Sequence, residues 1–368
     1  MKSRMYQAIA MSAVLMPPAV HSVELNPDIS VVLDGYYKSG HSALSSRDEG
    51  FGLGHTELSL YSPVDDLFEA RLTAVLEEHD GETELGLEEA FMQTTALPLG
   101  LNIRAGRFLS QVGYLNSRHL HEDDFVERPA AYRALLGSHY FDDGLRVNLL
   151  MPTPFYWSVG AEAFDGGQLT GEGDDSTVGV WTANTRIGGD ISTSQSWQAG
   201  FSWLRNRLAG HDDHGEEHDH DHAHAHGAEY TGKNLYVTDL VWKWSPGGNT
   251  RQRLLTLSGE YLYADELNDH ALNGDTHEGW YASAVYQFAP QWSAGLRYGE
   301  IDVLDAHGDH FHGQRLEETD VMLSWNHSHF STLRLQYTHQ EGHGFDHIDN
   351  TVTLQYVMTF GAHGAHDF

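Results

Sequence analysis

Apolar and polar residues alternate along most of the chain with a period of two, which is the pattern of a β-strand with two different faces. In the segment 68–77, Phe68, Ala70 and Leu72 fall on one face, while Glu69 and Arg71 fall on the other. The same alternation recurs in sixteen segments, and no helical periodicity competes with it. The expected strands are 29–38, 51–62, 67–78, 84–96, 99–109, 141–150, 155–164, 177–188, 195–205, 234–244, 253–263, 279–288, 291–301, 318–327, 329–340 and 349–360.

Each expected strand has about the 9–11 residues that a tilted membrane strand needs. The connections alternate between short turns, such as 97–100 and 245–249, and long acidic segments. Short turns at one end and long loops at the other are typical of bacterial outer-membrane barrels. A soluble β-sandwich or β-solenoid is the alternative, but it does not predict this asymmetry. We expect an all-β fold, a 16-stranded antiparallel transmembrane β-barrel with short periplasmic turns and long extracellular loops.

The N-terminus has the organisation of a secretory signal. Lys2 and Arg4 precede the mostly apolar stretch 8–20, and Ser22 closes a sequence that suits signal peptidase. No other segment approaches the run of about 20 apolar residues that a membrane helix needs. We expect a cleaved signal peptide over 1–22, a barrel over 23–368 and a location in the bacterial outer membrane.

The composition of the chain excludes several kinds of site and activity. The chain has no cysteine, which excludes disulfides, thiolate catalysis and cysteine-based zinc sites. Its formal net charge of -32 repels nucleic acid and attracts cations. No phosphate-binding glycine loop, nucleophile elbow or His-Glu-x-x-His motif occurs. We therefore expect no enzymatic activity, no obligatory cofactor and no nucleic-acid partner.

The C-terminus carries a family resemblance. Phe368 lies in phase with the apolar positions of the last expected strand, and resembles the terminal signature of outer-membrane proteins. With the signal peptide and sixteen strands, the chain is similar to the general and substrate-selective porins. This resemblance implies outer-membrane lipid and lipopolysaccharide as surroundings and a homotrimeric assembly. The final segment 361–368 departs from the usual apolar ending and resembles the tails of His-loop barrels from zinc-starved proteobacteria.

Histidines and carboxylates interleave in the expected extracellular loop 206–233. Neutral imidazole and carboxylate are natural ligands of Zn²⁺ and similar divalent metals. Histidines at every second position share a face of an extended chain, and those four apart share a face of a helix, so either conformation makes a site. A solvated, disordered loop is the alternative. The expected ligands are His211, His214, His218, Asp219, His220, Asp221, His222, His224 and His226.

The segment 110–140 is the third long loop, and in porins that this chain resembles the third loop folds inward and constricts the pore. Glu122, Asp123 and Asp124 would then form a negative constriction, with His119 and His121 as transient Zn²⁺ ligands. The alternative is a surface loop with ordinary solvated charges.

Two further groups have candidate roles. His307, His310 and His312 have ligand-like spacing in the expected loop 302–317, although each is also typical of a solvated loop residue. On the polar face of the expected strands, cationic side chains would point into the lumen and set up a transverse field. Alternatively they neutralise acidic residues across the lumen. These wall residues are Arg71, Arg104, Arg146, Arg297 and Arg334.

The sequence thus predicts a passive, cation-favouring porin whose surface loops capture Zn²⁺ or a similar metal for uptake. Metal affinity should fall below about pH 6, because imidazoles with a pKa near 6.5 take up protons instead. The alternatives are a general nutrient porin without metal specificity, and a surface metal-buffering or adhesion protein with a plugged barrel.

Overall fold

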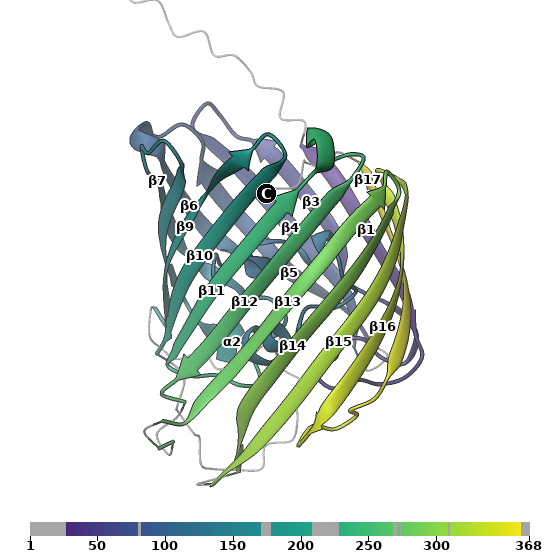
Figure 1. Cartoon of the computed structure of the whole chain (residues 1–368). Helices are drawn as coiled ribbons and strands as arrows, with labels where there is room; N and C mark the ends of the chain where they lie inside the picture. The colour runs from purple at the N-terminus through teal and green to yellow at the C-terminus, as the bar shows by residue number, and fades with distance from the viewer. Residues whose placement is uncertain are drawn as a thin grey trace, which may run out of the picture.

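The wall of the molecule is one antiparallel sheet that closes on itself. The computed structural model describes residues 27–79, 82–170, 178–207, 228–267, 271–272, 274–307 and 310–361. Within them seventeen strands pair in sequence order, and β1 also pairs with β17 (Figure 1). β2 and β3 both pair with β1 and are two segments of one wall strand. The expected 16-stranded antiparallel barrel is therefore confirmed.

The elements follow the predicted order closely. The strands are β1 (Asp28–Lys38), β2 (Gly50–Leu53), β3 (Thr56–Pro63), β4 (Phe68–His79), β5 (Glu82–Thr94), β6 (Leu101–Leu109), β7 (Phe141–Leu150), β8 (Tyr156–Phe164), β9 (Val180–Ser192), β10 (Gln195–Asn206), β11 (Asn234–Trp244), β12 (Leu254–Asp265), β13 (Thr276–Ala289), β14 (Trp292–His307), β15 (His310–Ser328), β16 (Ser331–His343) and β17 (Thr351–Gly361). The helices are α1 (Ala130–Leu136) and α2 (Gly167–Thr170), with 3-10 turns η1 (Pro98–Gly100), η2 (Leu115–Ser117), η3 (Leu120–Glu122) and η4 (Pro246–Gly248). In the part of the chain that the structure describes, no helix is long and apolar enough to cross a membrane.

The period-two pattern sorts side chains between the two faces of the wall. On β17, Val352, Leu354 and Tyr356 are exposed on the outside, whereas Thr353 and Gln355 between them are buried inside. An apolar exterior and a polar interior are what a barrel in lipid requires. The wall strands are thus placed by a pattern that is local in the sequence.

Most connections alternate as expected, but at the long-loop end only two residues separate β4 from β5 (80–81) and β14 from β15 (308–309). At the upper end in Figure 1, two residues, 193–194, join β9 to β10, and 329–330 join β15 to β16. At the lower end lie the long connections, among them the segment 110–140 between β6 and β7. All of the long connections therefore emerge on one side of the barrel.

One expected loop is instead a strand pair. The segment 302–317 continues the hairpin of β14 and β15, and His307 pairs in register with His310. His312 is exposed on β15. The prediction that these three histidines occupy a surface loop is wrong.

The extension of this hairpin has a packing cause. Ile301, Val303 and Leu316 point inward, are 0%, 2% and 0% exposed, and join a cluster of apolar residues inside the barrel. Burial of each such side chain stabilises the fold by about 1.5–3 kcal/mol. The strands therefore continue as long as their inner face has apolar residues to bury.

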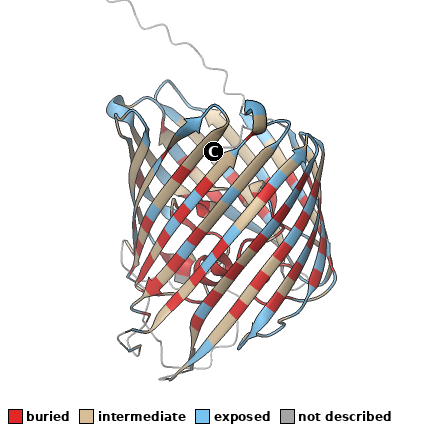
Figure 2. Cartoon of the chain, viewed as in Figure 1, coloured by how far each residue is buried: buried red, intermediate tan, exposed pale blue. Residues whose placement is uncertain are grey.

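That apolar cluster is built around the segment 110–140, which lies inside the barrel. Every residue of α1 is buried, and α1 packs against the inner faces of β13 and β14. Figure 2 shows these buried segments within the ring of strands. At this level the interior is filled by the chain itself.

Polar contacts attach the segment to strands all around the wall. The backbone N–H of Gly113 donates to Ser202 on β10 at 3.1 Å, and that of Val126 donates to Gln336 on β16 at 2.8 Å. Arg133 pairs with Glu318 on β15. Because these strands lie at different points of the circumference, the segment spans the lumen instead of lining one side.

Glu260 on β12 is a central anchor, so its removal should loosen the segment. Its carboxylate accepts hydrogen bonds from the backbone of Tyr114 and Leu115 and from the hydroxyls of Tyr132 and Tyr281, at 2.8–3.0 Å. In Glu260→Ala each buried donor left without an acceptor costs about 1–3 kcal/mol. We expect higher single-channel conductance in planar bilayers and faster proteolysis within 110–140.

The matched control is Glu69→Ala, because Glu69 on β4 accepts from Tyr61 and Gln93 of the wall. It should keep the conductance of the unmodified protein. A Glu260→Ala barrel with unchanged conductance and an equally protected segment would contradict this role of the anchor.

Candidate metal centre

Histidine and glutamate side chains gather where the segment 110–140 meets β3 and β5. We call these six residues the luminal cluster; they form two trios, and within each trio the ligand atoms all lie within 4.8 Å of one another. The His139 trio consists of His55, Glu88 and His139, and the His119 trio consists of Glu57, His119 and His121.

A β-bulge places the first wall carboxylate. Thr73 of β4 is opposite Glu89, and the next residue, Ala74, is opposite Leu87, so Glu88 is an extra residue in β5. Adjacent residues of a regular strand point to opposite faces, whereas a bulge redirects one of them. Glu88 and Glu89 are consequently both buried, each 2% exposed.

A second irregularity places the other wall ligands. Between β2 and β3 the chain leaves the regular ladder at Gly54 and His55, while β1 continues. A Cβ atom at Gly54 would lie 2.2 Å from the guanidinium of Arg47 and 2.3 Å from the carboxylate of Asp34, so a side chain here would displace this buried ion pair. His55 and Glu57, two residues apart, both turn into the interior and are buried.

The loop ligands come from both ends of the inward segment. His119 and His121 flank the start of η3, and His139 follows α1 directly. α1 ends at Gly137 in the left-handed conformation, with φ 58°, and Ser138 follows with φ 73°. This turn directs His139 back towards the wall.

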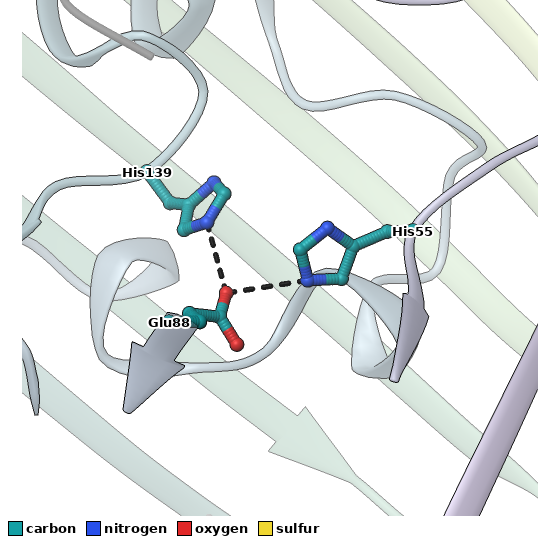
Figure 3. A group of neighbouring side chains, drawn as sticks. All are labelled: His55, Glu88 and His139. Carbon is teal, nitrogen blue, oxygen red and sulfur yellow. Dashed lines mark ion pairs between the residues drawn. The ribbon is translucent and has the colours of Figure 1, made fainter. Parts of the chain in front are cut away.

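Within the His139 trio the side chains point at one another (Figure 3). Glu88 Oε1 lies 2.9 Å from His139 Nε2 and 3.2 Å from His55 Nε2. These three buried atoms make no hydrogen bond with any described residue. Buried nitrogen and oxygen atoms that lie close together without hydrogen bonds are typical of the ligands of a cation.

The His119 trio has similar spacing. Glu57 Oε1 lies 2.6 Å from His121 Nδ1, and Glu57 Oε2 lies 3.6 Å from His119 Nδ1. Two imidazoles and one carboxylate make up each trio, a combination that binds zinc and other first-row metals. The structure therefore offers two candidate ligand sets.

The two buried carboxylates lack arginine or lysine partners. Among the described residues, the ion pairs of Glu57 and Glu88 are all with histidines. Glu89, by contrast, lies 3.7 Å from Arg71 and 3.9 Å from Arg104. A buried charge requires a counter-charge, so this cluster needs either imidazolium or a bound cation.

The histidines of the segment differ in their protonation. Burial lowers the pKa of His119, but the carboxylates of Glu57, Glu89 and Glu88 raise it further, so that it stands well above the ordinary value. Burial lowers the pKa of His139, and its contact with Glu88 only partly opposes this. His139 is thus a neutral imidazole ready to bind a metal, whereas His119 must first release a proton.

A cavity of about 400 Å³ adjoins the His139 trio, and Arg107 and Gln168 also line it. It lies where the wall is least paired, because β5 and β6 form their ladder only over Ala90–Gln93 and Arg104–Arg107. The trio is therefore beside open space large enough for water and a hydrated ion.

Two of the three carboxylates predicted to form a negative constriction pair with arginines. Glu122 lies 3.4 Å from Arg118, and Asp123 is buried with its Oδ2 2.9 Å from Arg128 Nε. Asp124 is exposed. Asp124 is thus the member of this group that presents its carboxylate to open space.

The five predicted wall arginines each lie close to a partner inside the barrel. In each pair the partner lies on a neighbouring strand of the wall, so none of these contacts crosses the lumen. The pairs are Arg71 and Arg104 with Glu89, Arg146 with Glu162, Arg297 with Asp320, and Arg334 with Gln355.

Other predicted features fall outside the described residues. These are the signal peptide 1–22, Phe368 and the side chains of His307 and His310. The same holds for His211, His214, His218, Asp219, His220, Asp221, His222, His224 and His226 of the His-rich loop.

Sequence reasoning named His119 and His121 but missed the other four members of the luminal cluster. One signal was available: Glu88 and Glu89 are consecutive carboxylates in a strand that otherwise alternates. Two adjacent charges cannot both face the lumen of a regular strand, so they permit a bulge, although Glu317 and Glu318 of β15 are also consecutive and lie in a continuous ladder. No comparable local signal marks His55 or His139.

Comparison with known proteins agrees with this architecture. No known family's sequence profile matches the chain. A protein of Aquifex aeolicus (strain VF5), described as uncharacterized, is 29% identical over 370 residues, covering 93% of this chain and 75% of that protein.

The similar solved structures are outer-membrane barrels. OmpT, an outer membrane protein of Vibrio cholerae, has a TM-score of 0.58 at 10% identity and covers 91% of this chain and 97% of its own. The anion-selective porin from Comamonas acidovorans has a TM-score of 0.58 at 12% identity, covering 92% and 100%. OprB of Pseudomonas putida at high pH has a TM-score of 0.55 at 14% identity, covering 91% and 94%. The chain has the fold of an outer-membrane porin barrel. This likeness concerns the fold.

If the luminal cluster binds metal, a divalent ion should stabilise the folded barrel. Binding to the folded state alone contributes about 2.7 kcal/mol when the free ion is at 100 times its dissociation constant. In a full-length variant whose seven histidines within 211–226 are replaced by serine, we expect Zn²⁺ to raise the unfolding temperature by several degrees. A chelator should reverse this, and the shift can be read from the heat-modifiable mobility of the barrel.

His119→Ala in that background should reduce the shift, because His119 is one of the two imidazoles of its trio. His339→Ala should keep it, because His339 lies 3.2 Å from Glu341 on β16, away from the cluster. Equal shifts in both variants would place the metal elsewhere.

Proposed function

We propose that this protein is an outer-membrane channel of the porin type that admits a divalent transition-metal ion, with Zn²⁺ as the first candidate, by passive diffusion. The luminal cluster is the site where the ion binds in transit. One observation carries the proposal: the buried trio of His55, Glu88 and His139 adjoins a cavity of about 400 Å³, and the three atoms by which its members face one another make no hydrogen bond with any described residue.

The charge of the chain supports this direction of selectivity. A net charge of -32 attracts cations, and the histidine-rich segment 211–226 raises their concentration at the extracellular side. Ions then move between sites of moderate affinity, which permit both entry and release. The resemblance to His-loop barrels of zinc-starved proteobacteria points to the same ion.

A second candidate function follows from the filled interior. The segment 110–140 contacts β10, β15 and β16 at once, and an obstructed lumen favours a surface barrel that stores metal or mediates adhesion. A general nutrient porin without metal specificity is less well supported, because it gives the luminal cluster no role.

The remaining parts of the proposal concern assembly and surroundings. One similar solved structure is a trimer form of OmpT from Vibrio cholerae, and we propose a homotrimer here. Export through the signal peptide 1–22, contact with lipopolysaccharide and a role in binding instead of catalysis belong to the same proposal.

The test is zinc entry into liposomes that contain the purified barrel and a trapped fluorescent indicator. We expect uptake at micromolar Zn²⁺ to fall at least tenfold in His139→Ala, because its imidazole is one of two in its trio. Serine substitution of the seven histidines of 211–226 should slow uptake only a few-fold, since it changes the local concentration and leaves the site.

His339→Ala serves as the control and should transport like the unmodified protein. Uptake that is equal in all variants would reduce the barrel to a general porin. Metal binding without uptake in any of them would favour the storage function.

A further inference from the structure

We infer that the luminal cluster is a dinuclear centre, holding two divalent cations that share the carboxylates of Glu88 and Glu57. The inference rests on the metal binding in the proposed function and adds the number and arrangement of the ions. Its starting point is that the ligand atoms divide into two trios of equal composition.

Glu88 lies between the two trios. Its Oε1 is within 3.2 Å of both histidines of the His139 trio, and its Oε2 is 3.1 Å from His119 Nδ1. The two oxygens of one carboxylate thus face different imidazole pairs. That is the position of a bridging ligand in a two-metal site, where the ions lie about 3.5–4 Å apart.

Glu57 makes a second connection, here through a single carboxylate oxygen. Its Oε1 lies 2.6 Å from His121 Nδ1 and 3.5 Å from His55 Nε2, which belongs to the other trio. With both carboxylates shared, each ion receives two imidazoles and two carboxylate oxygens. Four such ligands satisfy the tetrahedral preference of Zn²⁺.

A further layer of carboxylates orients the histidines. Glu77 Oε1 lies 2.5 Å from His55 Nδ1, and Glu89 Oε2 lies 3.2 Å from His119 Nε2. In both residues the other ring nitrogen points into the cluster. A carboxylate behind a metal-binding imidazole fixes its tautomer and direction, and such pairs are a regular feature of metal sites.

The positions of the ligands also indicate which parts of the chain the two ions would join. Each trio combines wall residues with residues of the inward segment: His55 and Glu88 with His139, and Glu57 with His119 and His121. Two bound ions therefore tie both ends of the segment 119–139 to β3, β5 and the turn between β2 and β3. Imidazole and carboxylate without thiolate suit Zn²⁺, Co²⁺ and related ions.

The test counts tightly held ions in the full-length protein with the seven histidines of 211–226 replaced by serine. After loading with Zn²⁺ and washing with a weak chelator, elemental analysis should find two ions per chain. His139→Ala and His121→Ala should each leave one ion, and the double variant none. His139→Gln, which preserves side-chain volume, should behave like His139→Ala if the loss is one of ligation.

Loading with Co²⁺ provides a second readout, because two bridged ions couple magnetically and a single ion does not. We expect the coupled signal in the parent and its loss in Glu88→Gln, while His339→Ala retains both the signal and two ions.

The outcomes separate this inference from the proposed function. One ion in the parent, lost in either single variant, would overturn the dinuclear centre and leave the uptake proposal standing. Two ions without any zinc entry would support the centre and overturn uptake. No retained ion would overturn the dinuclear centre, and zinc entry in the liposome assay would then show whether uptake proceeds through weaker sites.

Discussion

The requirement that enclosed polar groups find partners determines how this barrel is filled. The wall encloses inward-facing carboxylates and amides, and the segment 110–140 brings its own unpaired backbone groups into the same space. The two sets satisfy each other: Glu260 takes four donors from the segment and β13, and Gln336 takes the N–H of Val126. Loss of such partners is costly in a low-dielectric interior. At the luminal cluster several buried nitrogen and oxygen atoms of the described residues meet without hydrogen bonds, and these atoms are the candidate ligands of a cation.

The cluster depends on two small departures from strand regularity. If β5 had no extra residue, Glu88 and Glu89 would point to opposite faces, and one carboxylate would face lipid, where an ionised side chain is destabilising. The break at Gly54 similarly brings His55 inward beside Glu57. Both departures weaken the wall ladder locally, and the bulge at Glu88 lies in the stretch of β5 that does not pair with β6. The wall therefore lacks some of its inter-strand hydrogen bonds where the candidate ligands and the adjoining cavity lie.

The fold was predictable from sequence, whereas the site was predictable only in part. Alternation is a property of neighbouring residues, so strands such as β11 and β17 could be placed to within a residue or two. The hairpin of β14 and β15 extended further because Val303 and Leu316 pack against the inward segment, which is a tertiary effect. His119 and His121 could be selected because they lie two residues apart on one loop. His55 and His139 are far apart in the sequence, and nothing local indicates that α1 and its left-handed C-terminal turn bring them to the same carboxylate.

A filled lumen and a transport function are compatible if the solute is an ion that proteins ligate directly. A general porin must leave a continuous water-filled path, because sugars and other nutrients keep contact with water as they pass. A metal ion exchanges its water for ligands and can move by steps between nearby ligand sets. Here the two trios touch through shared carboxylates, and one of them borders open space. Low conductance of ordinary salts would therefore be consistent with selective metal entry, and only the metal flux itself distinguishes a selective channel from a store.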